Sequence, residues 1–392
     1  MICISIVIAM NIDIEEHSIK RVFLITIDCL RADYLKVFNP TASARTPNID
    51  KLASQSILFE NCWSAGPATY SSFPAIFTSR YLLASDNISP DPFTPTVAQI
   101  LSRNGFYTVG VNSNVYISSF FNWDRGFNSF YDRLIPAHMR NTIRKTRRIR
   151  FRSSLLRYLN KLATEYIRSR NLHKLIKFIK LTVKRKTMLP YADAQTMNNF
   201  LKEKLLEELH KRKLFLWIHY MDVHYPYNSE IWEKYFESPE EFYGTISFIY
   251  TKNPKFVSKD ELRFLINAYR ASIEYVDRFI GDIIDWFGDL GLLEDSIIIL
   301  AADHGEELLE HGGIGHHDGK LFNELLHVPL ILWGLGKERV HYNVSLIDLP
   351  TTLLHLLKIK KPKRYLGGDM FSEEEKPIYS EDALLYGYNI YY

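Results

Sequence analysis

The segment Arg21–Asp28 reads RVFLITID. A short apolar run that is rich in β-branched residues and closed by a carboxylate is typical of a strand buried on both faces of a sheet. The same pattern recurs as LFLWIHYMD over Leu214–Asp222 and as SIIILAADH over Ser296–His304. In each segment, polar side chains that are capable of chemistry follow directly where the apolar run ends.

Helical patterns lie between these predicted strands, over residues 97–105, 194–212 and 260–291. Strands that alternate with helices predict an α/β fold with a mostly parallel sheet covered on both faces. Ligands of such sheets bind beyond the carboxyl ends of the strands. We therefore expect five residues that are distant in sequence to converge: Asp28, His219, Asp222, Asp303 and His304.

The composition bounds the class of protein. The chain has 392 residues, of which 46% are hydrophobic and 14% aromatic, so it can form one or two globular domains with a large core. No apolar run reaches the roughly 18 residues of a membrane span. The apolar start ICISIVIAM is short, lacks a preceding basic region and is followed by acidic residues, which fits a secretory signal poorly and predicts a cytoplasmic protein.

The three cysteines, Cys3, Cys29 and Cys62, form no CxxC pair. This spacing predicts neither a disulfide framework nor a zinc cluster, and we expect the cysteines to serve as buried packing residues.

Positive charge is concentrated in one segment. Residues 140–186 hold seventeen Lys and Arg and one acidic residue, Glu165, a net charge of +16, which leaves 31 basic and 44 acidic residues elsewhere. Apolar residues recur there at helical spacing, so we interpret residues 136–190 as a basic helical insertion or cap. Its charge suits an anionic membrane surface or a polyanionic substrate, with the enzyme peripheral at the membrane. Nucleic acid is disfavoured as a partner because no binding motif is recognisable.

A cluster of hydroxyl residues opens the segment GPATYSSFPAIFTSR, residues 66–80. Thr69, Ser71 and Ser72 precede an apolar stretch, an arrangement that can present a nucleophile at the start of a helix. Ser and Thr are also favoured there as helix caps that satisfy free backbone N–H groups, which is the more common role of such a cluster. Both interpretations remain open from this segment alone.

Histidines gather in the second half of the chain. Seven of the thirteen lie between His219 and His327. The adjacent Asp303 and His304 can offer a carboxylate and an imidazole to a divalent metal that keeps an open position for substrate. For the other histidines, a hydrogen bond to the backbone of a loop is the more common role.

Five segments occur in a family's order: VFLITIDCLRADYL, TPNIDKLASQSILFENCWSAGPATYSSFPAIFTSRY, LFLWIHYMDVHYPY, IIILAADHGEELLEHGG and LLHVPLIL. Together they resemble the sulfatase family of the alkaline phosphatase superfamily, over residues 21–368 except the basic insertion. The resemblance implies an alkaline-phosphatase-like α/β/α sandwich around a mostly parallel sheet. It also implies a metal that activates a covalent nucleophile.

The resemblance divides the chain into parts. Residues 21–135 and 191–370 form the predicted sulfatase-like catalytic domain, and residues 136–190 form the insertion. Residues 1–20 are then an N-terminal extension, and residues 371–392 are a C-terminal tail.

The nucleophile motif departs from the sulfatase pattern. Sulfatases carry a Cys, converted to formylglycine, in a CxPxR motif followed by a Thr-Gly pair. Aligning that Thr with Thr78 places Thr69 at the nucleophile position, with Ser71 and Phe73 where the motif has Pro and Arg. There is no Cys to convert, so no formylglycine is expected. An unmodified Thr resembles the superfamily's phosphodiesterases, phosphonate hydrolases and phosphoglycerol or phosphoethanolamine transferases.

The remaining site residues are carried over from the family. The implied metal ligands are Asp28, Thr69, Asp303 and His304. The implied substrate contacts are His224, which is also a catalytic candidate, His317 and Lys320.

We expect one divalent ion, and manganese, magnesium, zinc and calcium all remain open. Cys29 stands where many sulfatases have a second Asp, which weakens the case for an all-oxygen calcium site. A second ion is disfavoured because no histidine occurs between Tyr225 and Asp303, where two-metal members carry an Asp-x-x-x-His pair. His219 and Asp222 remain unconventional candidates for a second site.

The sequence thus predicts a metal-dependent hydrolase or transferase that cleaves a phosphate, phosphodiester or phosphonate ester through a covalent Thr69 intermediate. Its substrate is expected to be an anionic ester. A sulfuric ester hydrolase is the alternative in the same class, and a non-catalytic binding protein that retains the fold is the alternative in another class.

Overall fold

The computed structural model describes residues 19–84, 89–132, 134, 189–228, 232–316, 319–372 and 377–382. Nearly all of the predicted basic insertion, residues 136–190, lies outside the described residues, as do most of the N-terminal extension and of the C-terminal tail. Within the described ranges, no helix is both long enough and apolar enough to cross a membrane.

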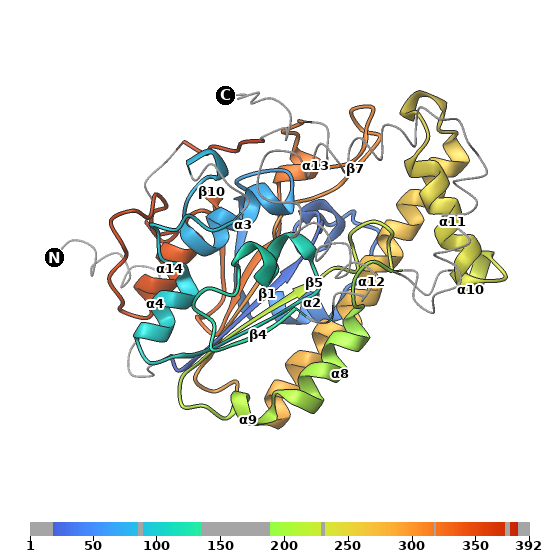
Figure 1. Cartoon of the computed structure of the whole chain (residues 1–392). Coiled ribbons are helices and arrows are strands. Elements are labelled where there is room, and N and C mark those ends of the chain that lie inside the picture. The colour runs from blue at the N-terminus through green and yellow to red at the C-terminus, as the bar shows by residue number, and fades with distance from the viewer. Residues whose placement is uncertain are drawn as a thin grey trace.

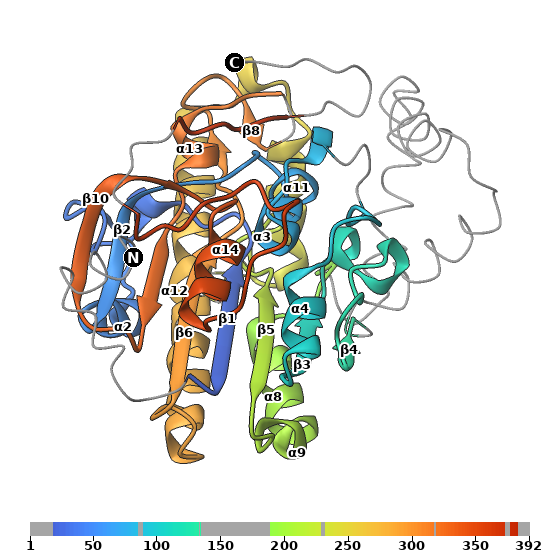
Figure 2. The ribbon, with the colours of Figure 1, turned by 90° about the vertical axis from the view of Figure 1, so that its left-hand side faces the viewer.

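An eight-stranded sheet forms the centre of the molecule, in the order β10-β2-β9-β6-β1-β5-β3-β4 (Figures 1 and 2). The strands are β1 (Arg21–Ile27), β2 (Ser56–Trp63), β3 (Tyr107–Asn112), β4 (Ser129–Tyr131), β5 (Leu214–Tyr220), β6 (Ser296–Ala302), β9 (Leu330–Trp333) and β10 (Glu338–Ser345). All neighbours pair in parallel except β9, which is antiparallel to both β2 and β6. The prediction of a mostly parallel sheet is confirmed.

Helices cover both faces of the sheet, as Figure 1 shows. One layer consists of α2 (Pro47–Ala53), α8 (Ala194–Lys204), α9 (Leu206–Leu209) and the long α12 (Lys259–Asp289). The other consists of α3 (Thr69–Thr78), α4 (Val97–Arg103) and α14 (Leu349–Leu356). The fold is therefore the predicted α/β/α sandwich.

Shorter elements complete the described chain. The α-helical ones are α10 (Trp232–Tyr235), α11 (Pro239–Tyr250) and α13 (Asn323–Leu326). A small hairpin pairs β7 (Glu307–Leu308) with β8 (Ile314–Gly315). The 3-10 turns are η1 (Ala32–Tyr34), η2 (Leu82–Ala84), η3 (Val115–Ile117), η4 (Ser119–Phe121) and η5 (Pro254–Phe256).

The predicted helices form with small changes at their ends. The helix expected over residues 194–212 is divided at Leu205 into α8 and α9. Ser258 begins α12, because its hydroxyl accepts from the backbone N–H of Glu261 while the Glu261 side chain accepts from Ser258 N–H.

The three central strands are buried along nearly their whole length, as their apolar sequences predict. Because β1, β5 and β6 are parallel and in register, their carboxyl ends meet at one edge of the sheet. The polar residues that follow the central strands are therefore brought together at one end of the sandwich.

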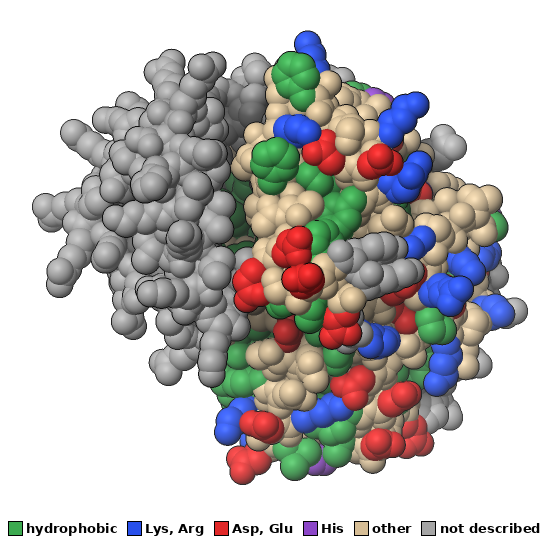
Figure 3. Space-filling view, turned by 90° about the vertical axis from the view of Figure 1, so that its right-hand side faces the viewer, with side chains coloured by type: hydrophobic (Ala, Val, Ile, Leu, Met, Phe, Trp, Pro, Cys, Tyr) green, Lys and Arg blue, Asp and Glu red, His purple; other side chains and the backbone are tan. Residues whose placement is uncertain are grey.

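On the outer face formed by α12, α8 and α11, acidic and basic side chains are interspersed (Figure 3).

Candidate active site

A buried polar cluster lies at the carboxyl edge of the sheet. Asp28 directly follows β1, while Asp303 and His304 directly follow β6, and all three are fully buried. His219 is the penultimate residue of β5 and is also fully buried. Four of the five residues expected to converge are therefore together, whereas Asp222 contacts Ala194 and Asn228 instead.

Thr69 is the hydroxyl that faces this cluster. It is the first residue of α3 and donates a hydrogen bond to Asp28 Oδ2 at 3.2 Å, while its Oγ1 lies 3.4 Å from His304 Nε2. Ser71 accepts from the Ala68 N–H group and donates to the Ala68 carbonyl, as a helix cap does. Ser71 therefore has the capping role, whereas the Thr69 hydroxyl faces the cluster and its role as nucleophile stays a prediction.

Aromatic packing fixes α3 in this position. Phe73 and Phe77 are buried against Trp217 of β5, with ring centroids 5.6 and 4.8 Å apart. Burying each phenylalanine stabilises the fold by about 1.5–3 kcal/mol relative to an exposed side chain. Phe73, which replaces the Arg of the sulfatase motif, therefore anchors the helix that carries Thr69.

Asp28 is held by a set of donors. Its Oδ2 accepts hydrogen bonds from Thr69, from Asn114 Nδ2 at 2.9 Å and from His219 Nε2 at 3.1 Å. Thr26 fixes His219 in turn, since its hydroxyl lies 2.8 Å from His219 Nδ1. Asn114, which also lies 3.4 Å from Thr69 Oγ1, was missed from the sequence. Its position just after the apolar strand β3 is the signal that could have found it.

Asp303 and His304 each direct an atom that could bind a metal toward Asp28. His304 Nδ1 donates to the Gly305 carbonyl at 2.8 Å, so its Nε2 carries a lone pair, 3.5 Å from Asp28 Oδ1 and 3.6 Å from Asp303 Oδ2. Asp303 Oδ2 is buried and accepts no hydrogen bond from the residues that the structure describes, because the nearby Thr69 hydroxyl donates to Asp28.

The two carboxyl groups have opposite pKa shifts. Burial and the negative charge of Asp28 raise the pKa of Asp303 to about 8. Burial also acts to raise the pKa of Asp28, but the His219 hydrogen bond and the charges of His224 and His304 hold this pKa well below its ordinary value. Without a cation, one buried carboxylate is thus stabilised and the other is not.

The residues present fit a divalent cation. Asp28, Asp303 and His304 offer ligand atoms that all lie within 4.8 Å of one another, and Thr69 Oγ1 lies beside them. A buried carboxylate oxygen without a donor, next to an imidazole lone pair, is the environment that a cation stabilises. This oxygen and nitrogen set suits manganese, magnesium or zinc.

A second group of side chains borders this set. The half-buried His224 offers a ligand atom within 4.8 Å of those of Asp28 and Cys29. Its ring centroid is 5.1 Å from that of His316, which lies 4.5 Å from the ring of His304. His316 Nδ1 donates to Glu306 Oε2 at 2.9 Å.

The sequence predictions assigned no role to His316 or Glu306. Both residues follow Asp303 and His304 closely in sequence, in a histidine-rich loop, and this position could have identified them as site residues.

The other predicted substrate contacts are Lys320 and His317. Lys320 donates to both Glu307 oxygens, at 3.0 and 2.7 Å, and to the His311 carbonyl at 3.1 Å, which occupies its three N–H groups inside the β7–β8 hairpin region. His317 lies outside the described residues. Substrate contacts by Lys320 and His317 therefore stay predictions.

Asp222, a candidate for a second cation site, serves as a cap. Its Oδ1 accepts from Ala194 N at 3.1 Å, at the start of α8, and from Asn228 Nδ2 at 2.7 Å. Burial raises the pKa of Asp222 to about 7. His219, the other candidate, contacts Asp28 instead.

Comparison with solved structures gives the class of protein. The chain resembles the phosphonate monoester hydrolase of Agrobacterium radiobacter with a TM-score of 0.62 at 18% identity, covering 93% of this chain and 79% of that one. It resembles the C-terminal periplasmic domain of EcEptC from Escherichia coli, in complex with Zn, with a TM-score of 0.62 at 13% identity, covering 97% and 93%. A protein of Vibrio parahaemolyticus described as belonging to the alkaline phosphatase superfamily matches with a TM-score of 0.55 at 15% identity, covering 93% and 72%. The fold is therefore that of the alkaline phosphatase superfamily.

Sequence comparison gives the family. A sequence model described as Sulfatase matches residues 20–359. Arylsulfatase K of Bos taurus is 32% identical over 150 residues, which is 35% of this chain and 26% of that protein, and arylsulfatase K of Homo sapiens is 31% identical over 134 residues, or 33% and 24%. The matched segment spans about a quarter of the length of these relatives. The chain belongs to the sulfatase family.

Proposed function

We propose that the protein cleaves a phosphate, phosphodiester or phosphonate ester through a covalent intermediate on Thr69. The observation that carries the proposal is the Thr69 hydroxyl, which is 4% exposed and opens a helix beside a set of metal-ligating atoms. If Thr69 served only as a helix cap, its hydroxyl oxygen would accept a hydrogen bond from a backbone N–H group, as the Ser71 hydroxyl does.

The described residues have separate roles in this proposal. Thr69 Oγ1 attacks the phosphorus atom as the bond from phosphorus to the leaving group breaks, and the Thr69 proton leaves by way of Asp28 Oδ2, to which the hydroxyl donates at 3.2 Å, to solvent. Asn114 orients both Asp28 and Thr69 through its amide N–H groups. The positive end of the α3 dipole lies where the ester oxygens gain negative charge. His224 contacts these oxygens or donates a proton to the leaving group.

Asp28, Asp303, His304 and Thr69 would hold one divalent cation. When bound, such an ion lowers the pKa of a coordinated hydroxyl and offsets the charge of the ester oxygens. The Zn complex of EcEptC shows that a protein with this fold is compatible with zinc, while the identity of the ion in this chain is left to experiment.

The nature of the nucleophile favours phosphoryl transfer. Formylglycine hydrate can release sulfate by eliminating it from a hemiacetal, whereas a sulfated threonine has to be attacked at sulfur or lose its ester through a strong C–O bond. A phosphorylated threonine can be attacked at phosphorus by water or by an acceptor alcohol. Thr69, in a chain with no Cys at this position, therefore suits phosphate or phosphonate esters.

A sulfuric ester hydrolase is the second candidate, favoured by the likeness to arylsulfatase K. Matched aryl phosphate, phosphonate and sulfate esters, each assayed with manganese, separate the two. We expect turnover of the phosphorus esters together with a mass adduct on Thr69 in quenched protein. Faster turnover of the sulfate ester would overturn the preference. Metal binding without turnover of any ester would favour a binding protein that retains the fold.

We also propose that residues 140–186 bring a cytoplasmic enzyme to an anionic lipid surface or polyanionic substrate. The support is the net charge of +16 in this segment, in a chain that is otherwise net acidic.

A further inference from the structure

Cys29 has an unusual backbone conformation within the polar cluster. It is fully buried and has a φ of 62°, in the left-handed region that residues other than glycine rarely adopt. Tyr269 of α12 holds this conformation, because its hydroxyl donates to the Cys29 carbonyl at 2.6 Å and accepts from the Arg31 N–H group at 3.1 Å. Such strained residues concentrate at functional sites, where the surrounding structure maintains them.

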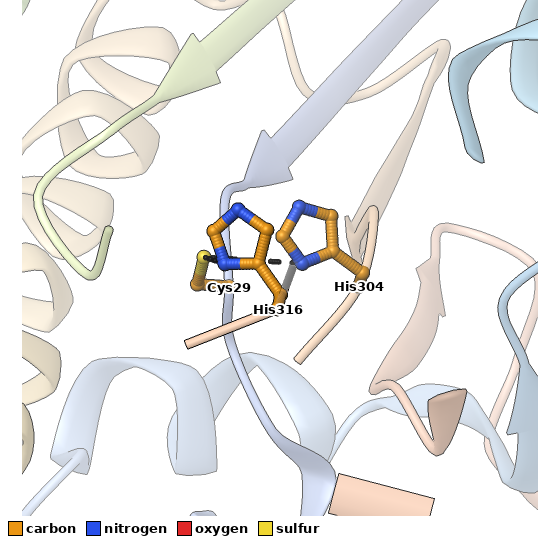
Figure 4. Close-up of side chains that lie close together, drawn as sticks. All are labelled: Cys29, His304 and His316. Atoms are coloured by element: carbon orange, nitrogen blue, oxygen red, sulfur yellow. Dashed lines mark hydrogen bonds between the residues drawn. The ribbon is translucent and has the colours of Figure 1, made fainter. Parts of the chain in front are cut away.

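The thiol of Cys29 lies near the imidazole rings of His316 and His304 (Figure 4). Its Sγ is 3.8 Å from His304 Nδ1 and 3.7 Å from His316 Nδ1. In a tetrahedral zinc site with Zn–S of about 2.3 Å and Zn–N of about 2.0–2.1 Å, sulfur and nitrogen ligands are about 3.6 Å apart. Both sulfur–nitrogen distances are therefore close to those between zinc ligands, and the ligand atoms of all three side chains lie within 4.8 Å of one another.

The charge around Cys29 also favours a cation. Asp28 and Glu306 are fully buried carboxylates near the thiol, and the pKa of each lies below its ordinary value, so both carry negative charge. The neighbouring Arg31 guanidinium pairs with Asp33 and Glu310, outside this group.

We propose that Cys29, His304 and His316 form a second site for a thiophilic divalent cation, zinc above all, and that occupancy of this site inhibits the enzyme. One thiolate with two imidazoles is a soft ligand set, unlike the oxygen-rich set at Thr69. The inhibitory part rests on the proposed function, whereas the binding part does not.

The inhibition follows from the two faces of His304. Its Nε2 faces Asp28, Asp303 and Thr69, while its Nδ1 faces Cys29 and carries the proton donated to the Gly305 carbonyl. A cation bound at Nδ1 requires the ring proton to move to Nε2, and a protonated Nε2 cannot bind the catalytic ion. The thiol proton of Cys29 passes to solvent. Occupancy of the second site therefore removes one ligand from the first.

Glu306, the hydrogen-bond partner of His316, can accommodate the binding of a cation at His316 Nδ1. His316 Nδ1 gives up its hydrogen bond to Glu306 when it binds a cation, and the ring proton moves to Nε2. Glu306 Oε1 then keeps the hydroxyl groups of Tyr227, at 3.1 Å, and Tyr250 as donors. Oε2 loses the His316 donor, and the positive charge of the nearby cation offsets this loss.

Cobalt titration of the whole protein tests the binding. Because cobalt at the Thr69 site has no sulfur ligand, a thiolate-to-cobalt charge-transfer band in the near ultraviolet reports the second site specifically. We expect the band in the wild type and in the matched controls Cys62→Ser and Cys3→Ser, and its loss in Cys29→Ser. A band that persists in Cys29→Ser, or no band in the wild type, overturns the proposal.

Zinc titration tests the inhibition. With manganese present, excess zinc should inhibit the wild type, and the zinc concentration for half inhibition should rise at least about tenfold in Cys29→Ser and in His316→Gln, each compared with its own zinc-free activity. Equal zinc sensitivity in both variants overturns the inhibitory role. If no ester is turned over by any variant, the proposed function fails, while the cobalt band still decides whether the second site exists.

Discussion

Asp303 and Glu306 are fully buried carboxyl groups at the same edge of the sheet, yet their surroundings are opposite. Glu306 accepts from His316, Tyr227 and Tyr250. Burial acts to raise the pKa of Glu306, but the hydrogen bond and charge of His316 lower it to about 2. Asp303 has one oxygen without a donor among the described residues, and burial with the nearby Asp28 raises its pKa to about 8.

The difference separates a carboxylate that the protein satisfies by itself from one that needs a further ligand. Glu306 is complete in the folded chain and orients His316. Asp303 is incomplete, and a cation supplies what is missing. Substitutions on the two sides should therefore affect different measurable properties.

The largest effect on turnover is expected from a substitution of Thr69, whose hydroxyl lies in the same cluster as Asp303. Thr69→Ala should lower the turnover of an aryl phosphate by at least about a thousandfold, because the covalent step loses its nucleophile. Metal affinity, measured by calorimetry, should change little, since Thr69 supplies one ligand of several. Ser72→Ala is the matched control, because Ser72 donates to the Thr69 carbonyl and not to the cluster. Full activity of Thr69→Ala, or inactivity of Ser72→Ala in its place, would show that the nucleophile is misassigned.

Asp303→Asn should show the next largest effect. Exchanging an anionic ligand for a neutral one should weaken metal binding by on the order of a hundredfold and lower the rate at limiting metal. Glu306→Gln is the matched comparison, and its affinity for the catalytic ion should remain within a few-fold of wild type. Equal losses in both variants would contradict the distinction between the two carboxylates.

Glu306→Gln should instead destabilise the fold. Tyr227 and Tyr250 donate to Oε1 and His316 donates to Oε2, so Gln places an N–H group against at least one donor, and the free energy of unfolding should fall by about 1–3 kcal/mol. Urea denaturation of metal-free protein measures this change. Tyr250→Phe removes one of the donors and should cost less. A Glu306→Gln variant as stable as wild type would mean that the Glu306 network does not stabilise the fold.

The fold and most of this cluster were predictable from sequence. Apolar runs that end at Asp28, Asp222 and Asp303 identified the central strands and the edge at which they meet. The Glu306 network was not predictable, because it depends on hydroxyl groups from β5's following loop and from α11. Cys29 was expected to be a packing residue, and its spacing from His304 and His316 becomes visible only when loops distant in sequence are assembled.

The pH dependence of stability should distinguish the two carboxylates further. In metal-free protein, the folded state keeps a proton on Asp303 up to about pH 8, whereas the unfolded chain loses it near the ordinary value of 3.8. The folded state then binds more protons than the unfolded state between these values, so its stability falls as pH rises through this window. Asp222, with a pKa raised to about 7, acts in the same direction.

Thermal melting of wild type and Asp303→Asn at several pH values isolates the Asp303 contribution. The variant should be the more stable protein near pH 8, and its advantage should vanish near pH 4. Saturating metal should reverse the order at pH 8, since the ion binds the ionised wild-type carboxylate. A constant difference at all pH values would show that Asp303 is not protonated in the metal-free fold.

The smallest effect on turnover is expected from changes in the basic segment, residues 140–186. These changes test whether binding to an anionic surface is separate from catalysis at the buried polar cluster. When Arg147, Arg148, Arg150 and Arg152 are all replaced by Glu, hydrolysis of a small soluble ester should be unchanged. The properties that depend on Asp303 and on Glu306, metal affinity and stability, should also be unchanged. The same variant should bind anionic vesicles more weakly than wild type, and the difference should shrink as salt screens the charges. Co-sedimentation with vesicles at low and high salt measures this. Because a segment that only keeps the chain in solution would contribute nothing to vesicle binding, unchanged binding would leave solubility as the role of these charges.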